Sequence, residues 1–132
     1  MTIELYVLLL TAIWTISLLI PVFLARLMTP NGIRWAMGNR DAEARLPSWH
    51  ARASKAHANM VENLAPFAVI IVVAHFCEVT NTWTIRAAIA FLICRIFHAV
   101  CYWFGLTPWR THFFILSLIA EALIVYQIWL MS

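Results

Sequence analysis

The chain has 132 residues and a formal net charge of +3, with 64% apolar and 11% charged residues. Soluble domains contain roughly 45–50% apolar and about 25% charged residues, and a chain this short cannot bury such an apolar surplus behind a water-facing shell. The composition therefore excludes an ordinary soluble domain and predicts a single membrane domain over residues 1–132. The apolar runs are long and unbroken, which predicts helices and not the alternating strands of a membrane barrel.

Four apolar segments are predicted to cross the bilayer as a four-helix bundle. The first carries no charge, and at about 1.5 Å per residue it would extend ~31 Å, enough for the hydrocarbon core. Pro21 is expected to bend this segment near its end, and Arg26 follows it. The four predicted spans cover residues 5–25, 56–77, 83–104 and 110–131.

The stretch from Met28 to His50 is polar and is interrupted by prolines and glycines, so it is predicted to be a loop. Within it, Asp41, Glu43 and Arg45 are expected to form one exposed helical turn. The second helix is expected to begin near Ala51, with polar first turns that protrude into water or line a protected cleft.

Basic residues gather in and beside the loop between the first two spans. They are Arg26, Arg34, Arg40, Arg45, Arg52 and Lys55. Positively charged loops stay in the cytoplasm, so this side is predicted to be cytoplasmic and both termini are expected on the opposite side. A basic cluster can also bind nucleic acid, but no soluble domain is expected to present it, and no nucleic-acid partner is predicted. The short loops favour a bacterial inner membrane, with an internal eukaryotic membrane as the alternative.

Three cysteines, Cys77, Cys94 and Cys101, fall within the predicted apolar segments. They form no CxxC pair and have no Cys/His ligand spacing, so neither a disulfide framework nor a metal site is predicted. Small packing residues are the simpler interpretation.

Two predicted helices carry polar residues at helical spacing. The second has four, separated by three, four and three positions: Arg52, Lys55, Asn59 and Glu62. The third has three, separated by three and four positions: Arg95, His98 and Tyr102. Such spacing places each set on one helical face.

Arg26 and Arg110 end the other two helices at the same level. One acid neutralises at most one of these cations, so the sequence predicts a pocket for a soluble anion beside lipid that could deliver an apolar partner.

An ion pair is predicted between Glu62 and Arg95. At about 1.5 Å per residue they lie ~12 and ~15 Å from the cytoplasmic ends of their helices, and either charge alone would cost ~2.5–3.5 kcal/mol in the membrane. Glu121, at a depth of ~16 Å on the same reckoning, is a rival partner for Arg95. The alternative is that these polar groups only join helices.

Two runs of residues resemble the MAPEG family, the membrane-associated proteins in eicosanoid and glutathione metabolism. Residues 52–67 read RASKAHANMVENLAPF, and residues 95–102 read RIFHAVCY, followed by Arg110. The resemblance implies a homotrimer with glutathione as cosubstrate at each subunit interface, near the cytoplasmic side, and Arg110 as the catalytic group that stabilises the thiolate. It implies that glutathione is contacted or supported by Arg26, Arg52, Lys55, Asn59, Glu62, Arg95, His98 and Tyr102.

The function implied by this resemblance is that of a glutathione transferase or peroxidase acting on lipophilic electrophiles or lipid hydroperoxides. Prostaglandin E synthase-like members carry arginine at the positions of Lys55 and Ala58, and some members carry a hydroxyl at the position of Phe114. Two other readings stay open. One is a non-catalytic member that binds lipid or a partner protein, and the other is an ion or proton pathway lined by Glu62, Arg95 and Glu121.

Overall fold

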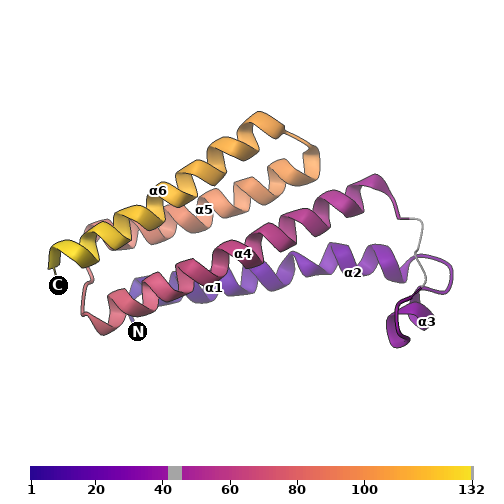
Figure 1. Ribbon diagram of the computed structural model, residues 1–132, viewed down its shortest axis with the longest axis horizontal. Coiled ribbons are helices and arrows are strands. Elements are labelled where there is room, and N and C mark those ends of the chain that lie inside the picture. Colours follow the sequence, from indigo (N-terminus) through magenta and orange to yellow (C-terminus); the bar gives the residue numbers. More distant parts are fainter. Residues whose placement is uncertain (42–45, 132) are drawn as a thin grey trace.

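The computed structural model describes residues 1–41 and 46–131, which form helices and no strands. The helices are α1 (Ile3–Ser17), α2 (Leu19–Leu27), α3 (Gly32–Met37), α4 (Ser48–Phe76), α5 (Thr82–Phe104) and α6 (Thr107–Met131). Four helical stretches are long and apolar enough to cross a membrane, with α1 and α2 counted as one. This confirms the predicted all-helical class with four spans. Both termini lie at one end of the bundle, and α3 and the α5–α6 turn lie at the other (Figure 1).

The first span is divided at Leu18, between α1 and α2. Pro21 has no backbone N–H, so it cannot donate to the carbonyl of Ser17, four residues earlier. The bend expected from Pro21 therefore lies one turn before the proline. Within α1, the buried hydroxyls of Thr11 and Thr15 donate to the carbonyls of Val7 and Thr11 at 2.7 and 2.8 Å. These bonds satisfy polar groups that would otherwise lie unpaired in an apolar environment.

The segment between the first two spans is less irregular than expected. Residues 32–37 form the short helix α3, and α4 begins directly after Pro47, so that His50 is already helical. Glycine and proline dominate the sequence signal here, and they obscured a short helix that carries Ile33, Trp35 and Met37. Most of the turn expected over Asp41, Glu43 and Arg45 lies outside the described residues.

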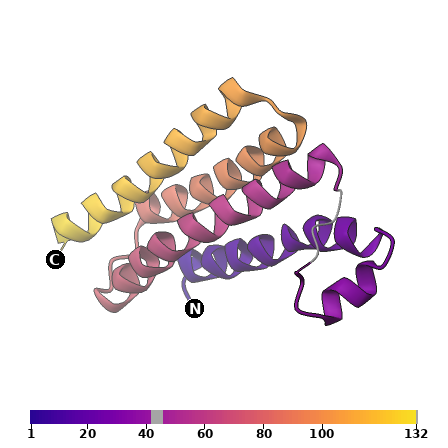
Figure 2. The same ribbon diagram turned by 45° about the vertical axis from the view of Figure 1, so that its right-hand side comes forward.

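The bundle is held together chiefly through α4 and α5. Each of these helices contacts α1 and α6, and they also contact one another. In the described part of the chain α6 contacts neither α1 nor α2, and Figure 2 shows it as the outermost helix. Small buried side chains let the helices approach closely, and at the centre Phe67 and Phe91 stack with ring centroids 3.9 Å apart. The alanines in this core are Ala56, Ala74, Ala87, Ala88, Ala99 and Ala120.

A buried carboxylate joins helices at the end that carries the termini. Oε1 of Glu4 accepts hydrogen bonds from Thr80 at 2.8 Å and Thr84 at 2.7 Å. Asn81, the N-cap of α5, accepts from the backbone N–H groups of Trp83 and Thr84. These contacts connect α1 to the start of α5, and nothing in the sequence had drawn attention to Glu4.

Candidate functional site

A pocket of about 220 Å³ opens between α4, α5 and α6, toward the end of the bundle with the α5–α6 turn. It is lined by Asn59, His98, Tyr102, Arg110, Thr111 and Phe114. Residues from the end of α5 and the start of α6 meet here because Gly105 reverses the chain between them. Its φ of 72° is left-handed, a conformation that glycine adopts without steric cost.

Arg110 is held at this pocket by an aromatic ring. The carbon of its guanidinium lies 4.5 Å from the centre of the Tyr102 ring, a distance at which a cation is attracted to the ring face. The rings of His98 and Tyr102 meet edge to face, with centroids 5.4 Å apart and an interplanar angle of 72°. This cation–π contact of Arg110 with Tyr102 positions the guanidinium at the pocket, and its N–H donors suit an anionic partner.

The amide of Asn59 is oriented by Arg95. Nη2 of Arg95 donates to Oδ1 of Asn59 at 2.6 Å and to the backbone carbonyl of the same residue at 3.2 Å. Arginine has donors only, so the oxygen of the amide must face it, and the NH₂ group is left for the pocket. Arg95 is 1% exposed and does not line the pocket. It therefore acts on the site through Asn59.

The predicted ion pair between Glu62 and Arg95 was wrong for a single chain. Glu62 is exposed, and the acid near enough to attract Arg95 is the rival candidate, Glu121, which is 7% exposed. The depth of a residue in the membrane does not by itself determine its partner, because the side chain must also point toward that partner around the helix axis. The buried stripe of α4 contains Ala53, Ala56, Met60, Asn63 and Phe67. The four predicted polar residues of α4 each stand one position before a residue of this buried stripe. One position turns an α-helix by about 100°, so the polar stripe is rotated by that angle from the buried stripe.

The other predicted residues of the site are dispersed in the single chain. Nε of Arg52 donates to the carbonyl of Trp103 at 3.0 Å, near the C-terminal end of α5. Lys55 is exposed on the outer stripe of α4. The guanidinium carbon of Arg26 lies 4.4 Å from the Trp35 ring, away from the pocket. The structure thus gathers four of the predicted residues, with Arg95 behind them: Asn59, His98, Tyr102 and Arg110.

Sequence reasoning had not singled out Thr111. It lines the pocket beside Arg110, and its hydroxyl donates to the carbonyl of Thr107 at 3.3 Å. A single threonine at the start of an apolar helix does not by itself indicate a ligand site. Phe114, one turn further along α6, contributes an apolar wall.

The pocket favours a negatively charged ligand. Its lining offers the guanidinium of Arg110 and the neutral donors of Asn59 and Tyr102, and among the described lining residues there is no acid. A preorganised set of donors without a carboxylate stabilises an anion such as a carboxylate or a thiolate. Across residues 1–41 and 46–131, no three His, Cys, Asp or Glu side chains lie together as a metal site would require.

Comparison with known proteins identifies the family of the chain. A family model described as MAPEG family matches residues 5–130, nearly the whole sequence. No curated protein and no solved structure matches the chain significantly. The match agrees with the four membrane-spanning helices and with the two runs of residues that resembled this family. The chain is therefore an integral membrane protein that belongs to the MAPEG family.

Proposed function

We propose that this protein is a membrane-bound glutathione transferase or peroxidase that uses the pocket between α4, α5 and α6. Membership of the family supports a role in glutathione or eicosanoid metabolism. The observation that carries the proposal is the guanidinium of Arg110, which lies over the Tyr102 ring in a pocket lined by further donors and by no described acid.

In the proposed reaction, Arg110 lies beside the sulfur of glutathione. A guanidinium favours the charged form of a neighbouring thiol, so the thiolate is populated near neutral pH. The hydroxyl of Tyr102 and the amide of Asn59 donate to the bound tripeptide. The thiolate then attacks an electrophilic carbon of an apolar substrate, a carbon–sulfur bond forms, and the leaving group departs with its electron pair. With a lipid hydroperoxide the same thiolate would attack the terminal peroxide oxygen instead. The oxygen–oxygen bond breaks, the lipid alkoxide leaves and takes a proton to become the alcohol, and a second glutathione converts the resulting sulfenic acid to glutathione disulfide and water.

We further propose that a homotrimer completes the site. A pocket of about 220 Å³ is smaller than the roughly 300–1,000 Å³ typical of ligand sites, so one chain would hold only part of a tripeptide. Lys55 and Glu62 are exposed on α4, and a neighbouring subunit packed on this stripe would add them and Arg52 to the glutathione site. Arg26 is left out of the proposed site, because its guanidinium lies over the Trp35 ring, and it does not line this pocket.

The proposal is tested with the detergent-purified protein. Adding glutathione should produce a thiolate band in the ultraviolet difference spectrum, and an aryl halide acceptor should be conjugated above the background rate. Arg110→Ala should remove both signals and leave the oligomer intact. Arg86→Ala is the matched control, because Arg86 is an exposed arginine of α5 outside the pocket.

Wild-type protein that shows neither a thiolate band nor conjugation would contradict the enzymatic proposal. Turnover that survives in Arg110→Ala would contradict the role given to this residue.

A second candidate is a non-catalytic member of the family that binds a lipid or a partner protein. Phe114 favours it, since this ring gives the pocket an apolar wall without a hydroxyl. The two proposals differ in one measurement: a non-catalytic member would bind an apolar ligand without forming the glutathione thiolate. The pathway expected along Glu62, Arg95 and Glu121 has less support, because Glu62 points away from the other two.

A further inference from the structure

A second cavity lies where the first span meets α3, and it shares no lining residue with the proposed glutathione site. Its volume is about 360 Å³, within the range of ligand sites. The lining residues are Leu19, Val22, Phe23, Arg26, Trp35 and Arg40. We name this cavity the α2–α3 groove. Arg26 is in the last turn of α2, so the groove is at the level where the first span leaves the hydrocarbon core.

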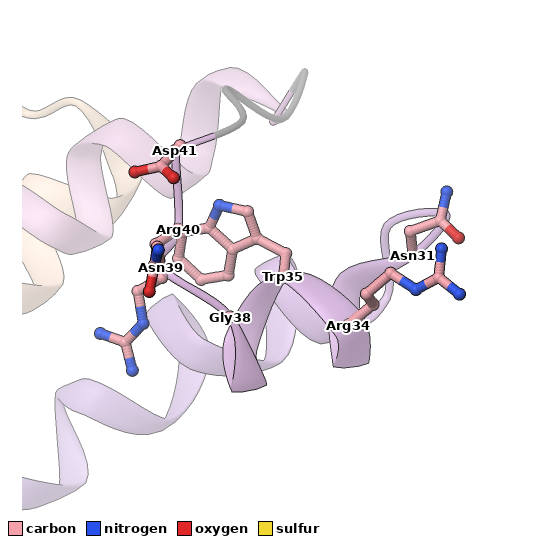
Figure 3. A pocket seen from close by; sticks show the side chains of 7 residues that line it. All are labelled: Asn31, Arg34, Trp35, Gly38, Asn39, Arg40 and Asp41. Atoms are coloured by element: carbon pink, nitrogen blue, oxygen red, sulfur yellow. The ribbon is translucent and has the colours of Figure 1, made fainter.

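The outer part of the groove carries two cations against one indole ring. The guanidinium carbons of Arg26 and Arg40 lie 4.4 and 5.5 Å from the centre of the Trp35 ring. Both distances allow a cation–π attraction. Figure 3 draws a neighbouring pocket that shares Trp35 and Arg40 with the groove. It shows these two residues side by side, with the carboxylate of Asp41 directed away from the Arg40 guanidinium. Among the described residues that line the groove there is no acid.

The inner part of the groove is apolar and open to the membrane. It is formed by one face of α2, with Leu19, Val22 and Phe23. Leu19 and Phe23 are 46% and 44% exposed, so their side chains also reach the surrounding hydrocarbon. A ligand that fits must therefore be anionic at one end and apolar at the other.

The groove is preformed by a close backbone contact. Gly32, the first residue of α3, is buried, and a Cβ atom there would overlap the carbonyl oxygens of Arg26 and Leu27. The N–H of Gly32 donates to the carbonyl of Thr29 at 2.9 Å, and the hydroxyl of Thr29 donates to the carbonyl of Arg26 at 2.6 Å. These contacts fix α3, and with it Trp35, against the end of α2.

We propose that the α2–α3 groove binds one anionic phospholipid. Its phosphate lies between the guanidiniums of Arg26 and Arg40, which are suited to bidentate hydrogen bonds with phosphate. One acyl chain lies along Leu19, Val22 and Phe23. Charge complementarity selects an anionic headgroup over a zwitterionic one, and the apolar inner part selects a lipid over a soluble anion. The proposal assigns Arg26 to this lipid and is independent of the activity proposed above.

The test is lipid binding to the purified full chain, measured by native mass spectrometry. Phosphatidylglycerol and phosphatidylcholine with identical acyl chains are compared. Arg40→Asn removes one cation, and asparagine tolerates the left-handed φ of 63° at this position. Arg34→Gln is the matched control, since it removes the same charge from α3 outside the groove. We expect Arg40→Asn to weaken phosphatidylglycerol binding about fivefold, with little change for Arg34→Gln or for phosphatidylcholine.

Three outcomes would overturn the proposal. One is an equal loss for Arg40→Asn and Arg34→Gln, which would indicate attraction to the basic surface as a whole. Another is equal binding of the two lipids by the wild-type protein. The third is displacement of phosphatidylglycerol by glycerol phosphate at the same concentration, which would mean that the apolar inner part adds nothing. Retention of phosphatidylglycerol against glycerol phosphate supports the proposal.

Discussion

The side chain of Asn59 has two ends in different surroundings. Its oxygen accepts from the buried guanidinium of Arg95, and its nitrogen borders the pocket. The same side chain therefore contributes to stability through one atom and to the proposed ligand site through another. Substitutions that change only one of these atoms can separate the two roles.

We expect Asn59→Asp and Asn59→Leu to differ in a diagnostic way. Aspartate keeps an acceptor for Arg95, so the thermal midpoint should change little, but its charge should repel glutathione. Leucine removes the acceptor and leaves a buried donor unpaired, which should lower stability by about 1–3 kcal/mol. Thermal unfolding and glutathione titration in detergent measure the two effects. Equal destabilisation by both variants would show that the hydrogen bond to Arg95 contributes little.

At the residue scale, the sequence predicted the chemistry of the site better than its contacts. Asn59, His98, Tyr102 and Arg110 follow helical spacing or a matching run of residues, and the structure gathers them. Which acid lies near Arg95 could not be predicted, because Glu62 and Glu121 lie at similar depth and differ in direction. That direction depends on which stripe of α4 faces the core, which is decided by packing against α1, α2, α5 and α6.

Among the elements, the connection between α5 and α6 has the clearest bearing on the site. It places Tyr102 next to Arg110, although eight positions separate them in the sequence. Gly105 forms the left-handed end of α5, and its N–H donates to the carbonyl of Tyr102 at 3.2 Å. A Cβ atom at this position would meet no other atom within 4 Å. The conformation of the backbone is thus the reason for glycine here.

Gly105→Ala should therefore destabilise the protein by about 1 kcal/mol, through backbone strain and without a steric clash. Gly105→Asn should cost less, since asparagine enters the left-handed region more readily. Thermal unfolding of the two variants in the same detergent checks this order. If alanine and asparagine were equally tolerated, φ at this position would not limit stability.

The long helices were predictable because lipid imposes a simple rule: apolar side chains outside and every backbone group bonded within the helix. The short helix α3 was not, since it depends on contacts of Gly32 with the end of α2 that local composition does not report. The N-terminal turns of α4 were expected to be polar and helical, and they extend the helix back to Ser48.

In the whole molecule, exposed charges lie along one stripe of α4. In a single subunit within a membrane, this stripe would face lipid. Glu62 is exposed on α4, in the apolar part of a helix long enough to span the membrane. Lys55 is exposed on the same stripe, nearer the start of the helix. A charge facing hydrocarbon costs ~2.5–3.5 kcal/mol on insertion scales. Covering this stripe with a second copy of the chain removes that cost, which is the physical reason to expect the proposed homotrimer.

Glu62→Gln should then weaken the assembly, because it removes an interfacial charge without changing side-chain size. Glu78→Asn is the control: Glu78 is an exposed acid beyond α4, and its φ of 58° suits asparagine. Native mass spectrometry should show trimers for the wild type and the control, and a larger monomer fraction for Glu62→Gln. A wild-type protein that is monomeric in mild detergent would contradict the proposed assembly.

The peripheral place of α6 has a consequence for the kinetics of the proposed reaction. This helix lines the pocket with Arg110 and Phe114 but has no contact with the described residues of α1 and α2, so hydrophobic molecules can approach it laterally. An oily electrophile would then reach the enzyme by diffusion within the detergent or lipid phase. Its effective concentration would be its mole fraction in that phase, and adding empty micelles at constant total substrate should slow turnover by dilution.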